Sequence, residues 1–510
     1  MKKLEEVLQD WEAVIGLEIH CELTKLETKM FCGCKLEFGA EPNTHTCPVC
    51  LGLPGALPVP NKAAIESIVL AGLATNCDIE KHSMFYRKNY MYPDMAKNFQ
   101  TTQGPVAFCM RGHLDLEVDG AGAKERIDID DLQVGETRGN ITKTEDGYIA
   151  HVGIERIHME EDAGKLVHDD WEDVSYVDYN RSGVPLIEIV SEPDMRSAEE
   201  VIAYLEKLRL IIQYLGASDC KLQEGSMRAD VNLSVREVGS TEFGTRTETK
   251  NLNSFSAISR AIEAERDRQI DLIESGEAVI QETRRWDDNK AYSYAMRSKE
   301  DAQDYRYFPD PDLVPLNISD EWLGEIRIRQ PEFKTEKMAR YATEYGIPEY
   351  DINLITDSKK LADIFEATTS LCNQPKKVSN WILGETMRIL KDKDMEPEDI
   401  TFSPENLAKL IKLVEAGTIN GSVAKDIFAV IFDEDVDPEA YVKEKGLAQV
   451  SDEGELRSVV EKVIADNAQS VEDYRNGKDK AIGFLVGQTM KAMKGKANPG
   501  LVNKILKELL

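Results

Sequence analysis

Glu188 stands in the middle of an apolar segment, where a soluble chain rarely tolerates a carboxylate. The segment PLIEIVSE, residues 185–192, alternates like a β-strand, so Leu186, Glu188 and Val190 fall on one face. A buried carboxylate is costly without a partner, and Glu188 therefore needs a cation, a metal ion or several donors. Upstream, IHMEEDAGK offers companions around a metal: His158, Glu160, Glu161 and Asp162. A structural ion pair with Arg181 is the alternative.

Three further segments repeat this pattern. They are residues 14–23 with Glu18, His20 and Glu22 on one face, residues 224–236 with Arg228, Asp230 and Asn232, and residues 246–250 with Arg246, Glu248 and Lys250. A solvent-exposed polar edge would explain any one of them. Four such segments together predict a concave sheet face that carries acids for divalent ions and Arg or Lys for phosphate oxygens.

Four cysteines have the spacing of a metal site. Cys32 and Cys34 form a CxC, and Cys47 and Cys50 form a CxxC after twelve intervening residues. Four thiolates suit tetrahedral zinc and leave no open position for a substrate, so we expect a structural zinc ribbon over residues 32–50. Replacement of one ligand by His45, or four unliganded cysteines, are the alternatives.

Residues 86–103 combine basic and aromatic side chains. Arg87, Lys88 and Lys97 stand among four aromatic residues. This mixture suits stacking of a base or binding of phosphates, and an ordinary loop explains it equally well. The chain contains no GxxxxGK[ST] motif, which excludes a P-loop as the phosphate site.

Composition indicates a soluble, multidomain chain. It has 510 residues, 42% of them hydrophobic, enough for two to four domains. No apolar run approaches the roughly 20 residues that span a bilayer, and the acidic start does not resemble a signal peptide, so we expect a cytoplasmic location without membrane contact. The net charge of −31 disfavours indiscriminate nucleic-acid binding, so any RNA contact requires local basic patches.

The second half of the chain reads as helical. Residues 304–319 form a proline-rich connection, and helical patterns follow at 332–346, 359–371 and 376–390. Residues 391–404 read as a charged linker with helix-breaking prolines. Residues 478–510 contain seven lysines against two acids, a local charge of +5, which is either a solvated helix face or an RNA-facing patch.

Many of these segments recur together in one known family. The chain resembles the B subunits of the aspartyl/glutamyl-tRNA amidotransferases. The motifs that carry the resemblance are GLEIHCEL, the cysteine pairs, PGALPVPN, RKNYMYPD, HMEEDAGK, DYNRSGVPLIEIVSEPD, EGSMRADVNLSVR, KNLNSF, QETRRWD and DYRYFPDPDL. They run in order from about residue 12 to the C-terminal helix, so the resemblance covers nearly the whole chain.

The resemblance implies an α+β fold with three parts. Residues 1–296 would form a large mixed-sheet, cradle-like catalytic domain that contains the zinc ribbon. Residues 297–404 would form a helical domain, and residues 405–510 a small all-helical tail domain that binds tRNA.

The implied activity is that of an ATP-dependent carbon–nitrogen ligase. Proteins of this family use ATP and Mg²⁺ to phosphorylate the side-chain carboxylate of Glu or Asp on mischarged tRNA(Gln) or tRNA(Asn). Ammonia, which a separate amidase (glutaminase) partner releases from glutamine, then gives Gln-tRNA(Gln) or Asn-tRNA(Asn). A third, small subunit would complete the heterotrimer.

The resemblance also assigns the site. Carried over position by position, the family's metal site falls on Glu18, His20, Glu161, Glu188, Asp230 and Glu248. We expect these residues to share one or two Mg²⁺ ions, and Ser226, Arg228 and Lys250 to contact phosphate. A non-catalytic tRNA-binding scaffold and a metal-dependent phosphohydrolase are the two competing hypotheses.

Overall fold

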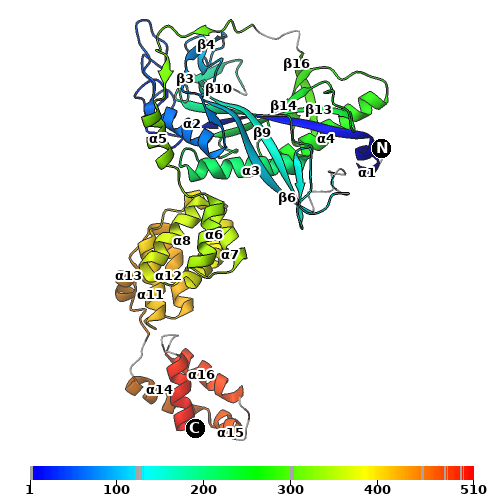
Figure 1. Ribbon diagram of the computed structural model, residues 1–510. Helices are drawn as coiled ribbons and strands as arrows, with labels where there is room; N and C mark the ends of the chain where they lie inside the picture. The colour runs from blue at the N-terminus through cyan, green and yellow to red at the C-terminus, as the bar shows by residue number, and fades with distance from the viewer. Residues whose placement is uncertain are drawn as a thin grey trace. The chain divides into compact units, whose positions relative to one another are not determined.

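The chain divides into two compact units. The computed structural model describes residues 4–120, 126, 129, 131–169, 171–298, 304–449, 453–475, 478, 480–493, 497 and 499–510 (Figure 1). The units are Met1–Glu332 and Phe333–Leu510. The predicted α+β class is confirmed, with a large mixed sheet in the first unit and helices in the second.

A large sheet dominates the first unit. Its main path runs β16-β15-β14-β13-β1-β12-β9-β5-β4-β17. The strands on this path are β1 (Trp11–Glu22), β4 (Phe85–Asn89), β5 (Phe99–Gln103), β9 (Gly147–Glu161), β12 (Pro185–Ser191), β13 (Met227–Glu237), β14 (Thr247–Lys250), β15 (Glu282–Asp287), β16 (Tyr292–Ser298) and β17 (Phe308–Pro309). Neighbours on this path pair antiparallel, except β14 and β15, which pair parallel.

Shorter strands extend or flank this sheet. Those attached to it are β2 (Asp78–Ile79), β6 (Cys109–Asp119), β7 (Thr137–Arg138) and β8 (Ile141–Lys143). Two separate ribbons consist of β10 (Lys165–His168) with β11 (Ser175–Asp178), and of β3 (His82–Ser83) with β18 (Leu316–Asn317).

Helices accompany the sheet in this unit. They are α1 (Leu4–Asp10), α2 (Lys62–Ala74), α3 (Ala198–Tyr214), α4 (Phe255–Glu274) and α5 (Asp320–Ile328). Asn61 caps α2, because its side chain accepts from the N–H groups of Ala63 and Ala64. Ser197 caps α3 in the same way, accepting from Glu200 N–H.

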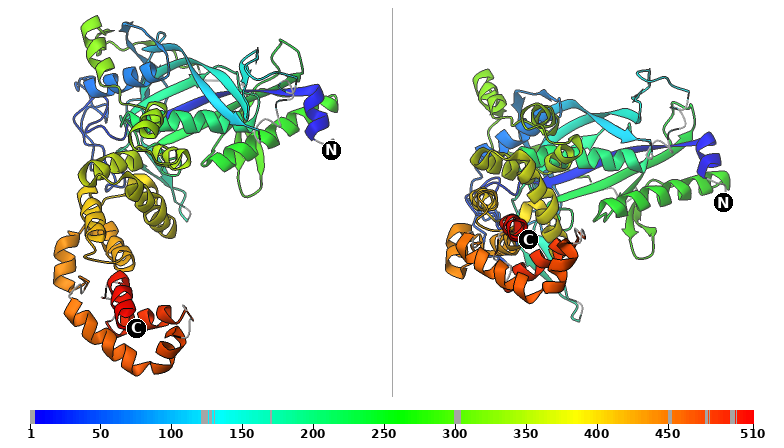
Figure 2. Two further views of the ribbon diagram at one scale, coloured as in Figure 1. Left: turned by 60° about the horizontal axis from the view of Figure 1, so that its bottom comes forward. Right: turned by 90° about the horizontal axis from the view of Figure 1, so that it is seen from below.

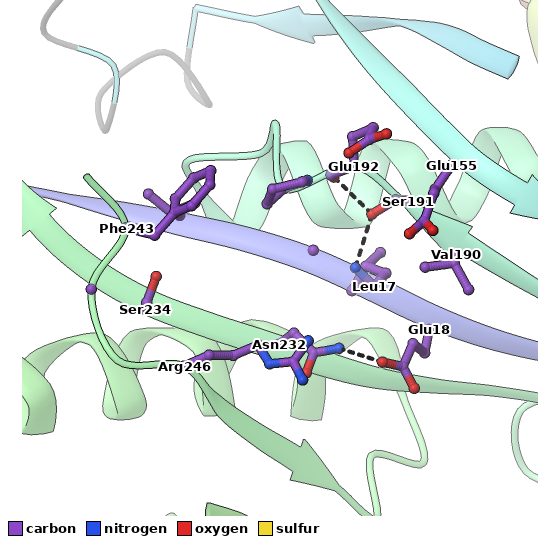
Figure 3. A pocket seen from close by; sticks show the side chains of 14 residues that line it. Leu17, Glu18, Glu155, Val190, Ser191, Glu192, Asn232, Ser234, Phe243 and Arg246 are labelled. Atoms are coloured by element: carbon purple, nitrogen blue, oxygen red, sulfur yellow. Dashed lines mark hydrogen bonds between the residues drawn. The ribbon is translucent and has the colours of Figure 1, made fainter. Parts of the chain in front are cut away.

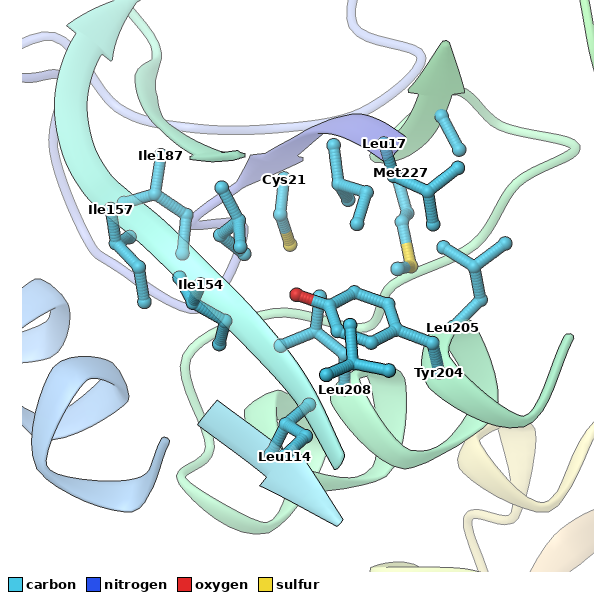
Figure 4. Close-up of a cluster of buried hydrophobic side chains, with 14 of the residues drawn as sticks. Leu17, Cys21, Leu114, Ile154, Ile157, Ile187, Tyr204, Leu205, Leu208 and Met227 are labelled. Atoms are coloured by element: carbon cyan, nitrogen blue, oxygen red, sulfur yellow. The ribbon is translucent and has the colours of Figure 1, made fainter. Parts of the chain in front are cut away.

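The apolar side of the sheet packs against α3. Tyr204, Leu205 and Leu208 of this helix face strand residues such as Leu17 and Ile187, all of them fully or almost fully buried (Figure 4). Because strand residues alternate, burial of the odd-numbered side chains of β1 turns the even-numbered ones to the opposite face. The predicted acids of β1 are even-numbered and therefore lie on the face away from α3.

The second unit consists of helices. They are α6 (Lys334–Glu344), α7 (Glu349–Thr356), α8 (Lys359–Cys372), α9 (Pro375–Asn380), the π-helical η4 (Trp381–Thr386), α10 (Met387–Lys393), the 3₁₀ turn η5 (Pro397–Asp399), α11 (Pro404–Glu415), α12 (Gly421–Glu434), α13 (Pro438–Lys445), α14 (Glu453–Asp466), α15 (Ala468–Arg475), α16 (Lys480–Ala492) and α17 (Pro499–Leu509). Figure 2 shows them in two further views.

Two apolar cores hold these helices. One joins side chains from α6 to α13, among them Phe365, Leu407 and Phe428. The other joins side chains of α14 to α17, among them Leu456 and Leu506. The helices on either side of residue 404 thus share one core, and the domain boundaries expected at 296/297 and 404/405 stay predictions. No helix in the described part of the chain is both long and apolar enough to cross a membrane.

Candidate metal and phosphate site

The pairing of β1 with its two neighbours arranges the predicted acids in rows. Glu18 of β1 lies opposite Asp230 of β13, and His20 lies opposite Glu188 of β12. Directly opposed residues of antiparallel strands point to the same face of a sheet. Glu248 joins this face because β14 continues the sheet beside β13. Five of the six residues expected in the metal site therefore share one polar face.

The centre of this face combines imidazole and carboxylate groups. One ligand atom from each of His20, Glu160 and Glu188 lies within 4.8 Å of the others. His20 Nε2 is 3.5 Å from Glu188 Oε2. His158 Nε2 lies 3.2 Å from the same oxygen and 3.3 Å from Glu160 Oε1. Imidazole nitrogens and carboxylate oxygens are ligands for divalent cations, so this donor set fits a metal ion.

Charges within this cluster stabilise one another. Burial opposes protonation of His158, but hydrogen bonds to Glu160 and Glu188 outweigh burial and raise its pKa to about 9. Burial also opposes ionisation of Glu188, but His158 and His20 outweigh it and hold the pKa of Glu188 far below its usual range. Glu188 is therefore ionised at neutral pH, the form that binds a cation.

Glu161 lies apart from this centre. Successive strand residues point to opposite faces, so β9 turns Glu160 toward Glu188 and Glu161 away from it. The Glu161 carboxylate instead accepts from the Lys97 ammonium group and, at 2.8 Å, from Thr101 N–H. The expectation that Glu161 joins the metal cluster is thereby corrected: in this structure Glu160 occupies that place.

Lys250 links two of the predicted acids. Its Nζ lies 2.5 Å from Asp230 Oδ2 and 2.7 Å from Glu248 Oε1. Burial opposes the charge on Lys250, but these two carboxylates outweigh it and raise its pKa. The ammonium group of Lys250 is therefore charged and lies on the acid-rich face, where a phosphate oxygen could exchange with one of its carboxylate partners.

Glu18 also lines a cavity of about 310 Å³ (Figure 3). Residues of β1, β12, β13 and the loop 243–246 line this cavity. Asn232 Nδ2 donates to Glu18 Oε1 at 3.1 Å. Burial, together with the charges of Glu188 and Glu248, raises the pKa of Glu18. A cation bound nearby would therefore stabilise the ionised form of Glu18.

The other two predicted phosphate contacts are engaged within the protein. Arg228 forms an ion pair with Asp162, and its Nε is buried without a hydrogen-bond partner among the described residues. Ser226 donates its hydroxyl hydrogen to Asp219 Oδ1 at 2.6 Å and accepts from Lys221 N–H at 2.8 Å. Ser226 thus stabilises the turn before β13, whereas Arg228 retains a donor.

Lys88 is a candidate that the sequence placed only in an aromatic, basic segment. It lies on β4, with its Nζ 5.1 Å from the ring centre of Tyr305. Burial opposes its charge, but Glu160, Tyr307 and Glu188 outweigh burial and raise the pKa of Lys88. β4 joins the sheet beside β5, which in turn pairs with β9, so local alternation within residues 86–103 does not reveal that Lys88 lies near these acids.

The four cysteines form a second cluster. One sulfur from each of Cys32, Cys34, Cys47 and Cys50 lies within 4.8 Å of the others. A hydrogen bond with Cys32 lowers the pKa of Cys50 to about 5, and burial raises the pKa of Cys34 to about 11. Four sulfurs at these separations could bind zinc.

The fold and the site together define an α+β protein with an acid-lined sheet face and a helical second unit. Comparison with known proteins shows the family. The family model described as GatB/GatE catalytic domain matches residues 13–324, and the one described as GatB domain matches residues 363–510. The chain belongs to the GatB/GatE family. The resemblance noted in the sequence is confirmed.

Individual relatives match along their full length. A protein from Lachnospira eligens is 64% identical over 509 residues, which cover 99% of this chain and 100% of that protein. One from Agathobacter rectalis is 63% identical, with 99% and 100% covered, and one from Caldicellulosiruptor bescii is 54% identical, with 98% and 99% covered. Each is named as the B subunit of an aspartyl/glutamyl-tRNA(Asn/Gln) amidotransferase.

The ion pair between Lys97 and Glu161 generates a prediction about stability. Both side chains are largely buried, so Lys97→Met leaves an uncompensated carboxylate in the interior. We expect the free energy of unfolding to fall by about 3–5 kcal/mol, measured by urea denaturation followed by tryptophan fluorescence. The matched variant Lys81→Met breaks an exposed pair with Asp320 and should cost about 1 kcal/mol or less. Equal losses in the two variants would contradict this placement of Glu161.

Proposed function

We propose that this chain acts as the B subunit of a tRNA-dependent amidotransferase. With ATP it phosphorylates the side-chain carboxylate of Glu on mischarged tRNA(Gln), or of Asp on mischarged tRNA(Asn). Ammonia then displaces the phosphate and gives Gln-tRNA(Gln) or Asn-tRNA(Asn), which makes the reaction an ATP-dependent carbon–nitrogen ligation with glutamine as amide donor. The family matches along nearly the whole chain support this assignment.

One observation carries the catalytic part of the proposal. His20, Glu160 and Glu188 converge on a sheet face that also holds Glu18, Asp230 and Glu248. A passive tRNA-binding scaffold has no need of so many acids on one face, because carboxylates repel RNA phosphates. A site for a divalent cation and a nucleotide explains them.

Mg²⁺ fits this donor set as the resident cation. His20, Glu160 and Glu188 would hold it, with Glu18, Asp230 and Glu248 beside it, and when bound it would supply charge neutralisation for the transferred phosphoryl group. An imidazole is an uncommon ligand for Mg²⁺, so His20 either binds a water on the ion or favours Mn²⁺.

Positively charged side chains of the protein help to bring two anions together, the attacking carboxylate and the phosphate. The attacking side-chain carboxylate has an ordinary pKa of about 4.3 or below and is ionised at neutral pH, so no general base is required. Catalysis then consists of positioning and charge neutralisation. Lys88, Arg228 and Lys250 contribute positive charge around the phosphates, whereas Ser226 contributes least because its hydroxyl is already engaged.

The remaining roles belong to partners and to the second unit. An amidase partner would supply ammonia from glutamine, and a third, small subunit would complete a cytoplasmic heterotrimer. The helical second unit would recognise tRNA through exposed lysines. Those described are Lys478, Lys480, Lys491, Lys504 and Lys507, while Lys494, Lys496 and the neighbouring Asp479 lie outside the described residues.

Zinc is the proposed occupant of the cysteine cluster. Four thiolates complete a tetrahedral site, so the ion would fix the ribbon without taking part in the reaction. The lowered pKa of Cys50 favours its thiolate, the form that binds metal.

Removing the charge at the centre of the site tests the catalytic proposal. Glu188→Gln should lower ATP-dependent amidation at least about 100-fold, because the cation loses a central ligand and the phosphate its neutralising charge. The assay reconstitutes the chain with its amidase and small-subunit partners and follows mischarged tRNA and ATP together. Glu117→Gln, on an exposed position of β6, serves as the control and should retain full activity. Undiminished amidation by Glu188→Gln would overturn the proposed site.

The zinc proposal has its own test. Purified chain should contain about one zinc ion, and Cys47→Ser should abolish the bound zinc and lower the melting temperature, because a structural zinc contributes directly to folding stability. Elemental analysis and thermal unfolding measure both effects. Cys372→Ser, at a cysteine outside the cluster, should leave the zinc content unchanged. The structural role would be refuted if the purified wild-type chain contained no zinc and if its melting temperature did not fall after treatment with a chelator.

A further inference from the structure

The acid-bearing face of the sheet continues beyond Lys250 onto β15. Thr283 of this strand donates its hydroxyl hydrogen to Glu248 Oε2 at 2.9 Å, so its side chain lies on the face that carries the acids. Arg285 stands two residues further along β15, and residues two apart on a strand point to the same face. The parallel pairing of β15 with β14 places Arg285 beside Lys250. A second cation therefore follows Lys250 on this face.

Arg285 has no charged partner of its own. It is exposed, and neither an ion pair nor a side-chain hydrogen bond joins it to another described residue. Its neighbour Arg284 is buried and pairs with Glu265 of α4 at 3.4 Å. Alternation along β15 thus separates an arginine that stabilises the fold from one whose guanidinium group is available. Such a group presents several N–H donors and suits a phosphate.

Two exposed tyrosines stand next to Arg285 on β16. Tyr294 lies opposite Arg285 in the antiparallel pairing of β15 with β16, and Tyr292 lies opposite Asp287. Directly opposed residues share a face, so both rings lie on the acid-bearing side, whereas Ser293 between them is buried. Tyr292 is 55% exposed and Tyr294 43% exposed. The two rings therefore form a flat aromatic surface beside an unpaired cation.

This surface lies at the edge of the sheet. β16 is the last strand at its end of the main path, and Met296 continues the row of exposed side chains. We call Arg285, Tyr292, Tyr294 and Met296 the tyrosine patch. A contiguous exposed apolar patch marks an interaction site, and an edge strand can pair with another protein chain. The unpaired charge of Arg285 favours a partner that carries anions as well as flat rings, which is the chemistry of single-stranded nucleic acid.

We propose that the tyrosine patch binds the single-stranded 3′ end of the tRNA substrate, an inference that rests on the proposed function. The rings of Tyr292 and Tyr294 stack on bases, and Arg285 binds a phosphate. The strands β15, β14 and β13 separate β16 from β1, so four spacings of about 4.8 Å place the patch about 19 Å from the strand of His20. Nucleotides held at the patch direct the terminal aminoacyl group along the sheet toward the metal centre, past Lys250.

Truncation of the two rings tests this proposal in tRNA binding. In the complex reconstituted with the amidase and small subunits, Tyr292→Ala combined with Tyr294→Ala should raise the Kd for full-length tRNA at least about tenfold, because a base–aromatic stack contributes binding energy of this order. The Kd for the same tRNA without its unpaired 3′ end should stay as in the wild type. Fluorescence anisotropy with labelled tRNA measures both constants.

Replacement of the arginine supplies a second readout. Arg285→Ala should weaken the binding of full-length tRNA and lower the slope of log Kd against log salt concentration by about 0.7, the change expected for one phosphate contact to a single strand. In amidation assays the KM for mischarged tRNA should rise, while the KM for ATP should stay near wild type.

Matched variants separate stacking from other effects. Tyr292→Phe combined with Tyr294→Phe keeps both rings and should bind tRNA like the wild type. Tyr176→Ala removes a tyrosine that is 59% exposed on β11, outside the tyrosine patch, and should change none of these constants.

Three results would overturn the proposal. They are alanine variants that bind full-length tRNA as tightly as the wild type or lose affinity equally for both tRNAs, a rise confined to the KM for ATP, and weaker capture of the amidase partner with unchanged tRNA affinity. The last result would instead make β16 a protein-binding edge. A wild-type complex that binds tRNA without ATP-dependent amidation would refute the proposed function itself.

Discussion

The register of β1 between β12 and β13 decides what this protein can do. A shift of one residue would turn Glu18 and His20 into the apolar core and expose Leu17 and Ile19. Packing against α3 opposes such a shift, because the odd-numbered side chains of β1 fill the core with those of the helix. Hydrophobic burial on one face therefore fixes the positions of the acids on the other.

Electrostatic repulsion is the main problem that this polar face must solve. Several carboxylates lie within a small, partly buried area, and each is costly to ionise there without a partner. Glu188 is compensated by two histidines, and Asp230 shares Lys250 with Glu248. Glu18 accepts a hydrogen bond from the Asn232 amide, and burial with the charges of Glu188 and Glu248 raises its pKa despite this bond. The protein's own groups thus neutralise part of the negative charge on this face, and a bound divalent cation would neutralise more of it.

Alternation along single strands was enough to predict much of this site. It placed Glu18, His20, Glu188, Asp230 and Glu248 on one face, because the period of two is a local property. The choice between Glu160 and Glu161 depended on the register of β9, which a sequence segment does not reveal. The resemblance to the family pointed to Glu161, whose side chain the structure directs away from Glu188. Local chemistry thus identified the strands, whereas long-range pairing selected the side chains.

Features formed by contacts between segments distant in the chain could not be predicted from the sequence. Lys88 meets the acids only because β4 joins the sheet beside β5, and the cavity exists only because the loop 243–246 lies against β13. The fold class was predictable because helical and strand periodicities occupy different halves of the chain. The extent of the helical cores was not predictable from the sequence. The proline-containing segment 391–404 reads as a linker between two helical domains, but in the structure it contributes to a single core.

Binding of Mn²⁺ to the purified chain, followed by electron paramagnetic resonance, tests the convergence of the acids most directly. Mn²⁺ stands in for Mg²⁺ and reports the affinity of the site without tRNA or partner proteins. If Glu160 from β9 completes the cluster, Glu160→Gln should weaken Mn²⁺ binding at least about tenfold, and Glu161→Gln should leave the affinity near wild type. The opposite order, or equal affinity in both variants and wild type, would contradict the arrangement described.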